Sequence, residues 1–100
     1  MLYGLSDETI AAIRTAISKQ PNVQEAILYG SRVKGNYRAG SDIDLTLKGK
    51  NLTLTDLFSL EEALDDLYLP YTFDLSIYTE LNHSELKAHI DRIGITFYSR

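Results

Sequence analysis

Residues 28–47 read LYGSRVKGNYRAGSDIDLTL and join two apolar segments through a basic loop punctuated by glycine. The first apolar segment leads into Gly30-Ser31, and the second opens with Asp42-Ile43-Asp44. A glycine and a hydroxyl at the start of a short helix present backbone N–H groups to an anion. Gly30 and Ser31 are therefore candidate phosphate-binding residues.

Polar and apolar residues alternate from Asp42 to Leu47, as in a strand with one buried face. Asp42 and Asp44 then lie on the same polar face, about 6.5–7 Å apart at Cα. Carboxylates at that spacing converge on one metal ion, or on two ions roughly 4 Å apart. A phosphate-binding turn followed by a carboxylate pair indicates phosphoryl or nucleotidyl transfer.

The same stretch carries a family resemblance. A Gly-Ser pair at 30–31, ten further residues and an Asp-x-Asp at 42–44 resemble the signature of the DNA polymerase β-like nucleotidyltransferases. The finer pattern, GSRVKG at 30–35 and SDIDL at 41–45, is similar to that of the minimal nucleotidyltransferase (MNT) subgroup, which more commonly has Ala-Arg at Val33-Lys34. The resemblance covers nearly the whole chain and implies the polymerase β-like fold, a small mixed sheet with helices packed against it.

Length and composition narrow the class of protein. One hundred residues suit a single domain, which we expect to span residues 1–100. There is no bilayer-spanning apolar run, no signal-peptide-like start and no cysteine, so a cytoplasmic protein without a membrane partner is expected. The net charge of −4 argues against direct nucleic acid binding. Five of the ten basic residues nevertheless lie between 32 and 50, a local patch suited to a small anionic ligand.

Hydrophobic periodicity predicts an α/β or α+β protein with the order α-β-(short α)-β-α-β-α. The first and last expected helices begin near Ser6 and Asn82, and a middle helix begins at Thr55-Asp56. The expected strands span 23–29, 43–47 and 71–78, and an apolar tail at 95–98 docks on the sheet. The helices are expected to bury the following residues: Ile10, Ile13, Ile17, Leu57, Leu60, Leu64, Leu67, Leu86, Ile90 and Ile93.

A third carboxylate lies in the middle of the strand 71–78. Alternation places Asp74 on the polar face, and aspartate is depleted in strands, so a functional role is favoured. The resemblance implies that a later strand beside the Asp-x-Asp strand supplies a third catalytic carboxylate, and Asp74 is the matching residue. His83 and His89 are isolated from this cluster in sequence and are expected to be surface or boundary residues.

Three carboxylates without cysteine or clustered histidine suit Mg²⁺ or Mn²⁺ and argue against zinc. We expect two ions. Asp42 and Asp44 would hold one on the triphosphate of ATP or another nucleoside triphosphate, and Asp44 and Asp74 would place the second beside an acceptor hydroxyl. The nucleotide-binding candidates are Gly30, Ser31, Arg32, Lys34 and Ser41, with Arg38 as a further candidate for the leaving pyrophosphate.

The acceptor has to come from outside a chain that is almost all catalytic core. Many members of the minimal subgroup resemble antitoxins that transfer AMP to a partner HEPN-domain ribonuclease toxin, typically at a tyrosine. The resemblance therefore implies a helical HEPN-like protein partner and a protein adenylyltransferase. Two alternatives are transfer to a small molecule such as an aminoglycoside with a helical partner subunit, and a non-catalytic module that neutralises its partner by binding alone.

Overall fold

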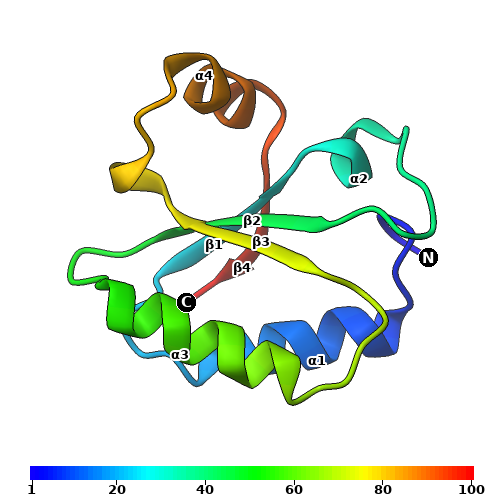
Figure 1. Cartoon of the computed structure of the whole chain (residues 1–100), viewed down its shortest axis with the longest axis horizontal. Coiled ribbons are helices and arrows are strands. Elements are labelled where there is room, and N and C mark those ends of the chain that lie inside the picture. Colours follow the sequence, from blue (N-terminus) through cyan, green and yellow to red (C-terminus); the bar gives the residue numbers. More distant parts are fainter.

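The computed structural model describes all residues, 1–100, as one sheet with helices on both of its faces (Figure 1). No helix in it is long and apolar enough to cross a membrane. The elements in chain order are α1 (Asp7–Ser18), β1 (Glu25–Tyr29), α2 (Ser31–Lys34), β2 (Ile43–Lys48), α3 (Leu54–Asp65), β3 (Phe73–Ile77), the 3₁₀-helix η1 (Tyr78–Glu80), α4 (Ser84–Ile93) and β4 (Ile95–Ser99).

The sheet has the strand order β3-β2-β1-β4 and is mixed, as the family resemblance implied. The central strand β1 runs antiparallel to β2 and to β4, whereas β2 and β3 are parallel. The apolar tail expected at 95–98 forms the edge strand β4. The parallel pair β2–β3 is the important one for function, because it aligns the starts of two strands that carry acidic residues.

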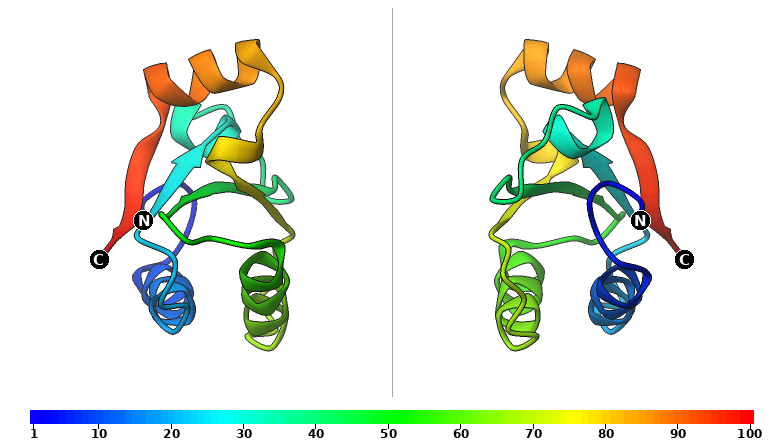
Figure 2. Two further views of the ribbon diagram at one scale, coloured as in Figure 1. Left: turned by 90° about the vertical axis from the view of Figure 1, so that its left-hand side faces the viewer. Right: turned by 90° about the vertical axis from the view of Figure 1, so that its right-hand side faces the viewer.

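Helices α1 and α3 cover one face of the sheet, and α4 lies over the other (Figure 2). The main core lies beneath α1 and α3 and confirms the helical stripes predicted there, except that Leu67 is only partly buried. Its residues include Ile10, Ile13, Ile17, Leu28, Ile43, Leu45, Leu47, Leu57, Leu60, Leu64 and Phe97. Apolar residues at alternate positions of β2 therefore point toward α1 and α3, and the intervening polar residues point the other way.

Helix α4 buries much less than its sequence predicts. Of the expected stripe only Ile90 is buried, where it packs on Ile27 and Tyr29 of β1. The helix contacts β1, so it leaves the polar face of β2 and β3 uncovered at their beginnings. That partial cover is what makes the face accessible to a ligand.

The helix ends differ in detail from the expected ones. Helix α3 begins at Leu54 behind a reciprocal cap between Thr53 and Asp56, slightly earlier than its polar residues suggest. The His83 ring caps α4, since its Nδ1 accepts a hydrogen bond from the Leu86 N–H at 3.1 Å. Gly94, the residue after α4, is extended at φ −60° and ψ 144°, so the chain passes directly from α4 into β4.

Candidate active site

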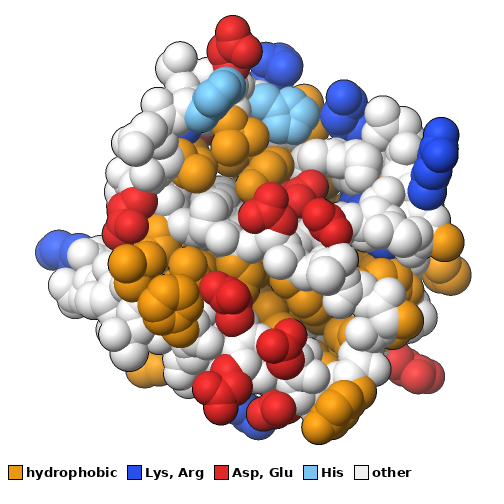
Figure 3. Space-filling view, viewed as in Figure 1, with side chains coloured by type: hydrophobic (Ala, Val, Ile, Leu, Met, Phe, Trp, Pro, Cys, Tyr) orange, Lys and Arg blue, Asp and Glu red, His pale blue; other side chains and the backbone are white.

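Two of the predicted carboxylates face each other across the parallel pair β2–β3. The register pairs Asp44 with Asp74, and it pairs Asp44 with Tyr29 on the other side. Neighbouring strands lie about 4.8 Å apart, so the side chains of Asp44 and Asp74 are adjacent on the face away from α1 and α3. Asp42 is exposed and directly precedes β2. Figure 3 shows the resulting group of acidic side chains where β2 and β3 begin.

The electrostatics of this cluster are unfavourable in the absence of a cation. Burial, together with the charges of Asp74 and Asp42, raises the pKa of Asp44 from 3.8 to about 6, and only Arg32 acts in the opposite direction. The pKa of Tyr29 is also raised, chiefly by burial and then by the charge of Asp74. Repulsion of this kind is what a divalent ion bound between carboxylates offsets.

The carboxylates nevertheless do not have the geometry of a metal site in this structure. No three Asp, Glu, His or Cys side chains have the arrangement of a ligand set. The hydroxyl of Thr72 donates a hydrogen bond to Asp42 Oδ1 at 2.8 Å and holds that side chain to one side. The donor set itself fits Mg²⁺ or Mn²⁺, which take carboxylate oxygens. Because Asp42 and Asp74 are exposed, their side chains are free to rotate toward an ion beside Asp44.

The raised pKa of Asp44 predicts how the stability of the metal-free protein depends on pH. Between pH 4 and 6 the folded state binds more protons than the unfolded state, so the free energy of unfolding should fall as the pH rises. The full shift would correspond to about 3 kcal/mol, which partial solvent exposure reduces to about 1–2 kcal/mol. In urea titrations with EDTA, Asp44→Asn should therefore be more stable than the wild type at pH 7 and similar to it at pH 4.

The matched control for this prediction is Glu61→Gln, which neutralises an exposed acidic residue on α3 far from the cluster. It should leave the difference in stability between pH 4 and pH 7 almost unchanged. Equal stability of Asp44→Asn and wild type at pH 7 would contradict the electrostatic description of the cluster.

The Gly30-Ser31 turn lies directly against this acidic cluster. Strand β1 ends at Tyr29, and Gly30 caps α2 with φ 81° and ψ −155°, a conformation reserved almost entirely for glycine. A Cβ placed on Gly30 would overlap Asp44 Oδ2. The predicted phosphate-binding turn and the predicted metal-binding carboxylate are thus in contact, although each was identified from a separate part of the motif.

The basic residues of the loop divide into two kinds. Lys34 and Arg38 are exposed and available to an anionic ligand. Arg32, a predicted nucleotide-binding residue, is instead buried, and its guanidinium donates hydrogen bonds to the backbone carbonyls of Tyr3 and Ser41. The hydroxyl of Ser41 accepts a hydrogen bond from the Arg38 N–H at 2.8 Å and so shapes the loop. In this structure Arg32 and the Ser41 hydroxyl are both engaged within the protein, where they hold the loop.

Two residues near the site, Thr72 and Tyr29, were not singled out by the sequence, and a third, His89, was expected only to be a surface or boundary residue. Thr72 holds Asp42, Tyr29 lies beside Asp44, and the His89 ring meets Tyr29 edge-on with 6.3 Å between centroids. The alternation in 71–78 placed Thr72 on the polar face with Asp74, so that signal was present. The position of His89 depends on how α4 crosses β1, which no local pattern encodes.

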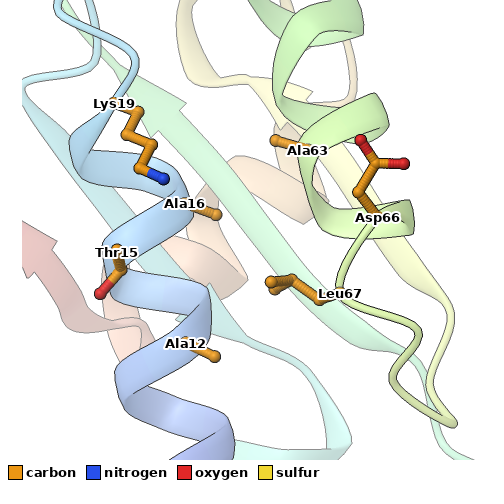
Figure 4. Close-up of a pocket in the computed structure, with 7 residues that line it drawn as sticks. All are labelled: Ala12, Thr15, Ala16, Lys19, Ala63, Asp66 and Leu67. Carbon is orange, nitrogen blue, oxygen red and sulfur yellow. The ribbon is translucent and has the colours of Figure 1, made fainter.

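The one sizeable cavity lies elsewhere, in a groove of about 440 Å³ between α1 and α3 (Figure 4). It is lined by Ala12, Thr15, Ala16, Lys19, Ala63, Asp66 and Leu67. The groove opens on the opposite side of the sheet from Asp44 and Asp74. It holds none of the predicted site residues.

Comparison with known proteins agrees with this fold and motif. No curated protein sequence matches the chain. A solved structure of a toxin-antitoxin with AMP-PNP has 19% sequence identity and a TM-score of 0.73, over 91% of this chain and 73% of that one. A mutant of the toxin-antitoxin MntA-HpeT has 16% identity and a TM-score of 0.70, over 96% of this chain and 75% of that one. The family model described as polymerase beta, nucleotidyltransferase, matches residues 11–100, and the chain belongs to that family.

Proposed function

We propose that this chain is a divalent-metal-dependent nucleotidyltransferase that transfers AMP from ATP to a hydroxyl of a helical, HEPN-type toxin and thereby acts as its antitoxin. The family membership supports nucleotidyl transfer in general. The choice of AMP, of a protein acceptor and of a toxin partner is the more specific part of the proposal.

The observation that carries the proposal is the contact between Gly30 and Asp44. The turn at Gly30 lies against the carboxylate of Asp44, so closely that a Cβ on residue 30 would overlap it. Asp44 is in turn paired with Asp74 across the two strands. Phosphate oxygens bound at the turn would therefore lie beside the carboxylates. The exposed side chains of Lys34, at the end of α2, and of Arg38, in the loop after it, would offset charge on the departing pyrophosphate.

Each residue has a defined task in the proposed reaction. The acceptor oxygen forms a bond to the α-phosphorus, the bond from that phosphorus to the β-phosphate oxygen breaks, and pyrophosphate leaves. Asp42, Asp44 and Asp74 would hold Mg²⁺, which neutralises phosphate charge and makes the acceptor hydroxyl more acidic. Gly30 and Ser31 bind and orient the β- and γ-phosphates through backbone N–H groups and a hydroxyl. Asp74, which is exposed, receives the proton of the acceptor hydroxyl.

The choice of partner rests on the two similar structures described above. Both are described as toxin-antitoxin structures, and one contains AMP-PNP, an analogue of ATP. At identities below 20% they establish a shared fold and leave the partner of this chain to experiment.

The proposal is tested by incubating the purified chain with ATP, Mg²⁺ and the helical protein encoded beside it, and by measuring the intact mass of that protein. We expect one or more AMP additions that disappear with Asp42→Ala and persist with Asp65→Ala, a matched change at an exposed residue of α3. Two results together would contradict catalysis and favour a binding module. The chain would form a stable complex with its partner without any mass change, and Asp42→Ala would neutralise the partner as well as the wild type does.

A further inference from the structure

Arg32 is a buried charge in a protein whose other charged side chains are all more exposed. It is 2% exposed, and it is the second residue of α2, directly after the Gly30-Ser31 turn. Burying a guanidinium is costly unless its N–H groups find acceptors. Here they do, and the acceptors show which parts of the chain Arg32 joins.

The hydrogen bonds of Arg32 go to backbone carbonyls of two distant segments. Nη2 and Nε donate to the Ser41 carbonyl at 2.8 and 3.2 Å, and Nη1 donates to the Tyr3 carbonyl at 2.8 Å. Tyr3 adopts φ 58°, which is uncommon for a residue other than glycine. The N-terminal segment is thus bent in a way that presents its carbonyl to this guanidinium.

Two aromatic rings pack against the same group. The guanidinium carbon lies 5.4 Å from the ring centroid of Tyr37 and 5.0 Å from that of Tyr71. Cation–π contacts at these distances are attractive, and they add a third segment, the one that leads into β3. Arg32 is therefore held by the N-terminus, the loop between α2 and β2, and the approach to β3.

Two of these contacts, to Ser41 and to Tyr71, lead to the segments that flank Asp42. Ser41 is the residue before Asp42, and Tyr71 is the residue before Thr72. Thr72 bonds to Asp42 and to the residue after it: its hydroxyl donates to Asp42 Oδ1 at 2.8 Å, and its carbonyl accepts the N–H of Ile43 at 2.9 Å. The buried arginine thus connects the helix that starts at the phosphate-binding turn to the two backbone segments that position Asp42.

We propose that Arg32, with Thr72 as its counterpart on the β3 side, is a positioning residue that holds Asp42 in register with the Gly30-Ser31 turn. This inference rests on the proposed function, because it assigns Asp42 to the metal that accompanies a bound nucleotide. It replaces a direct contact between Arg32 and phosphate, for which a guanidinium that is 2% exposed and bound to two carbonyls is unavailable.

Lysine cannot take over this task. One ammonium group has no planar face to stack between Tyr37 and Tyr71, and it cannot present a fixed fork of donors to two separate carbonyls. Arg32→Lys keeps the charge and removes the geometry, so it is the variant that separates positioning from simple attraction of phosphate.

The experiment measures ATP affinity in EDTA and in Mg²⁺ for the wild type, Arg32→Lys and Arg14→Lys. Arg14 is the matched control, since its Nε donates to the Phe97 carbonyl at 2.8 Å and its guanidinium lies 5.1 Å from the Phe97 ring, on the side of β4. For Arg32→Lys we expect metal-free affinity close to wild type and a loss of about 10- to 100-fold in the gain that Mg²⁺ provides. Arg14→Lys should keep that gain.

Thr72→Val provides a second variant that should fold normally, because Thr72 is exposed. It removes the hydroxyl that holds Asp42 and should reduce the Mg²⁺-dependent gain without lowering metal-free affinity. Equal losses with and without Mg²⁺ in Arg32→Lys would instead indicate a direct phosphate contact. A lower melting temperature with an unchanged Mg²⁺-dependent gain in both variants would overturn the positioning role.

A separate readout distinguishes failure of this inference from failure of the proposed function. If the wild type shows no Mg²⁺-dependent ATP binding, the proposed function is wrong. Amide hydrogen exchange still tests whether the hydrogen bonds and ring contacts of Arg32 hold the loop before Asp42. Faster exchange across residues 36–42 in Arg32→Lys, but not in Arg14→Lys, would support the positioning of Asp42. Unchanged exchange in that loop would refute it.

Discussion

Replacing Gly30 with alanine should abolish nucleotide binding and lower the melting temperature by about 10 °C. Two effects combine at this position. The backbone conformation of φ 81° and ψ −155° costs a residue with a side chain about 1–3 kcal/mol. The new Cβ would also overlap Asp44 Oδ2, so either the turn or the carboxylate has to move. Movement of either one separates the phosphate site from the metal site.

Gly35→Ala is a closely matched control for the first of these effects. Gly35 ends the same short helix at φ 87°, but a Cβ there would meet nothing within 4 Å. It should therefore lose stability from backbone strain alone and retain nucleotide binding. Differential scanning fluorimetry and calorimetric titration with Mg²⁺ and ATP measure both quantities.

A double variant isolates the second effect. In Gly30→Ala/Asp44→Ala the overlapping oxygen is gone, and Asp44→Ala alone is the reference because loss of this charge is itself stabilising. Relative to that reference, Gly30→Ala should cost less stability than it does in the wild type, and the cost should approach that of Gly35→Ala. If Gly30→Ala and Gly35→Ala prove equally stable and bind nucleotide equally well, the contact between Gly30 and Asp44 has no functional meaning.

Periodic sequence patterns predicted the parts of the structure that depend on local geometry. The alternation around Asp44 gave the correct face of β2, and the stripes of α1 and α3 gave the correct core. These patterns work because side-chain direction repeats every two residues in a strand and every 3.6 in a helix. That the strand of Asp74 lies beside the strand of Asp44 came only from the family resemblance. The parallel register that pairs the two residues comes from the structure.

The burial of Arg32 is a feature that local patterns did not predict. A basic residue in a glycine-rich loop beside a phosphate-binding turn is reasonably interpreted as a ligand for phosphate. Its burial results from Tyr3 and Tyr71, which lie 29 and 39 positions away in the sequence, and no local pattern relates them to the loop. The limited burial of α4 is similar. Leu86 and Ile93 follow the helical period but are only partly buried, and Leu86 packs at the margin of the small cluster of Ile27, Tyr29 and Ile90.

Asp44→Asn should reduce the rate of AMP transfer by about 10³-fold or more, the loss typical of removing a key electrostatic group. Asparagine keeps the size of the side chain and the register with Asp74, so the change is confined to charge. The same variant is expected to be more stable than the wild type without metal. A gain in stability with a loss of activity is characteristic of a site in which carboxylates repel one another until a cation binds.

Asp74→Asn separates this interpretation from a general effect of lost acidity. Asp74 is exposed and paired with Asp44, so its neutralisation should relieve some of the same repulsion and also reduce transfer. Glu61→Gln removes one negative charge from α3 and should leave the rate unchanged. The measurement is the rate of AMP incorporation into the partner as the Mg²⁺ concentration is varied, because variants that bind the ion poorly should need more of it. Full activity of Asp44→Asn at ordinary Mg²⁺ concentrations would remove Asp44 from the metal site, since an amide cannot replace the charge that draws the ion between the two strands.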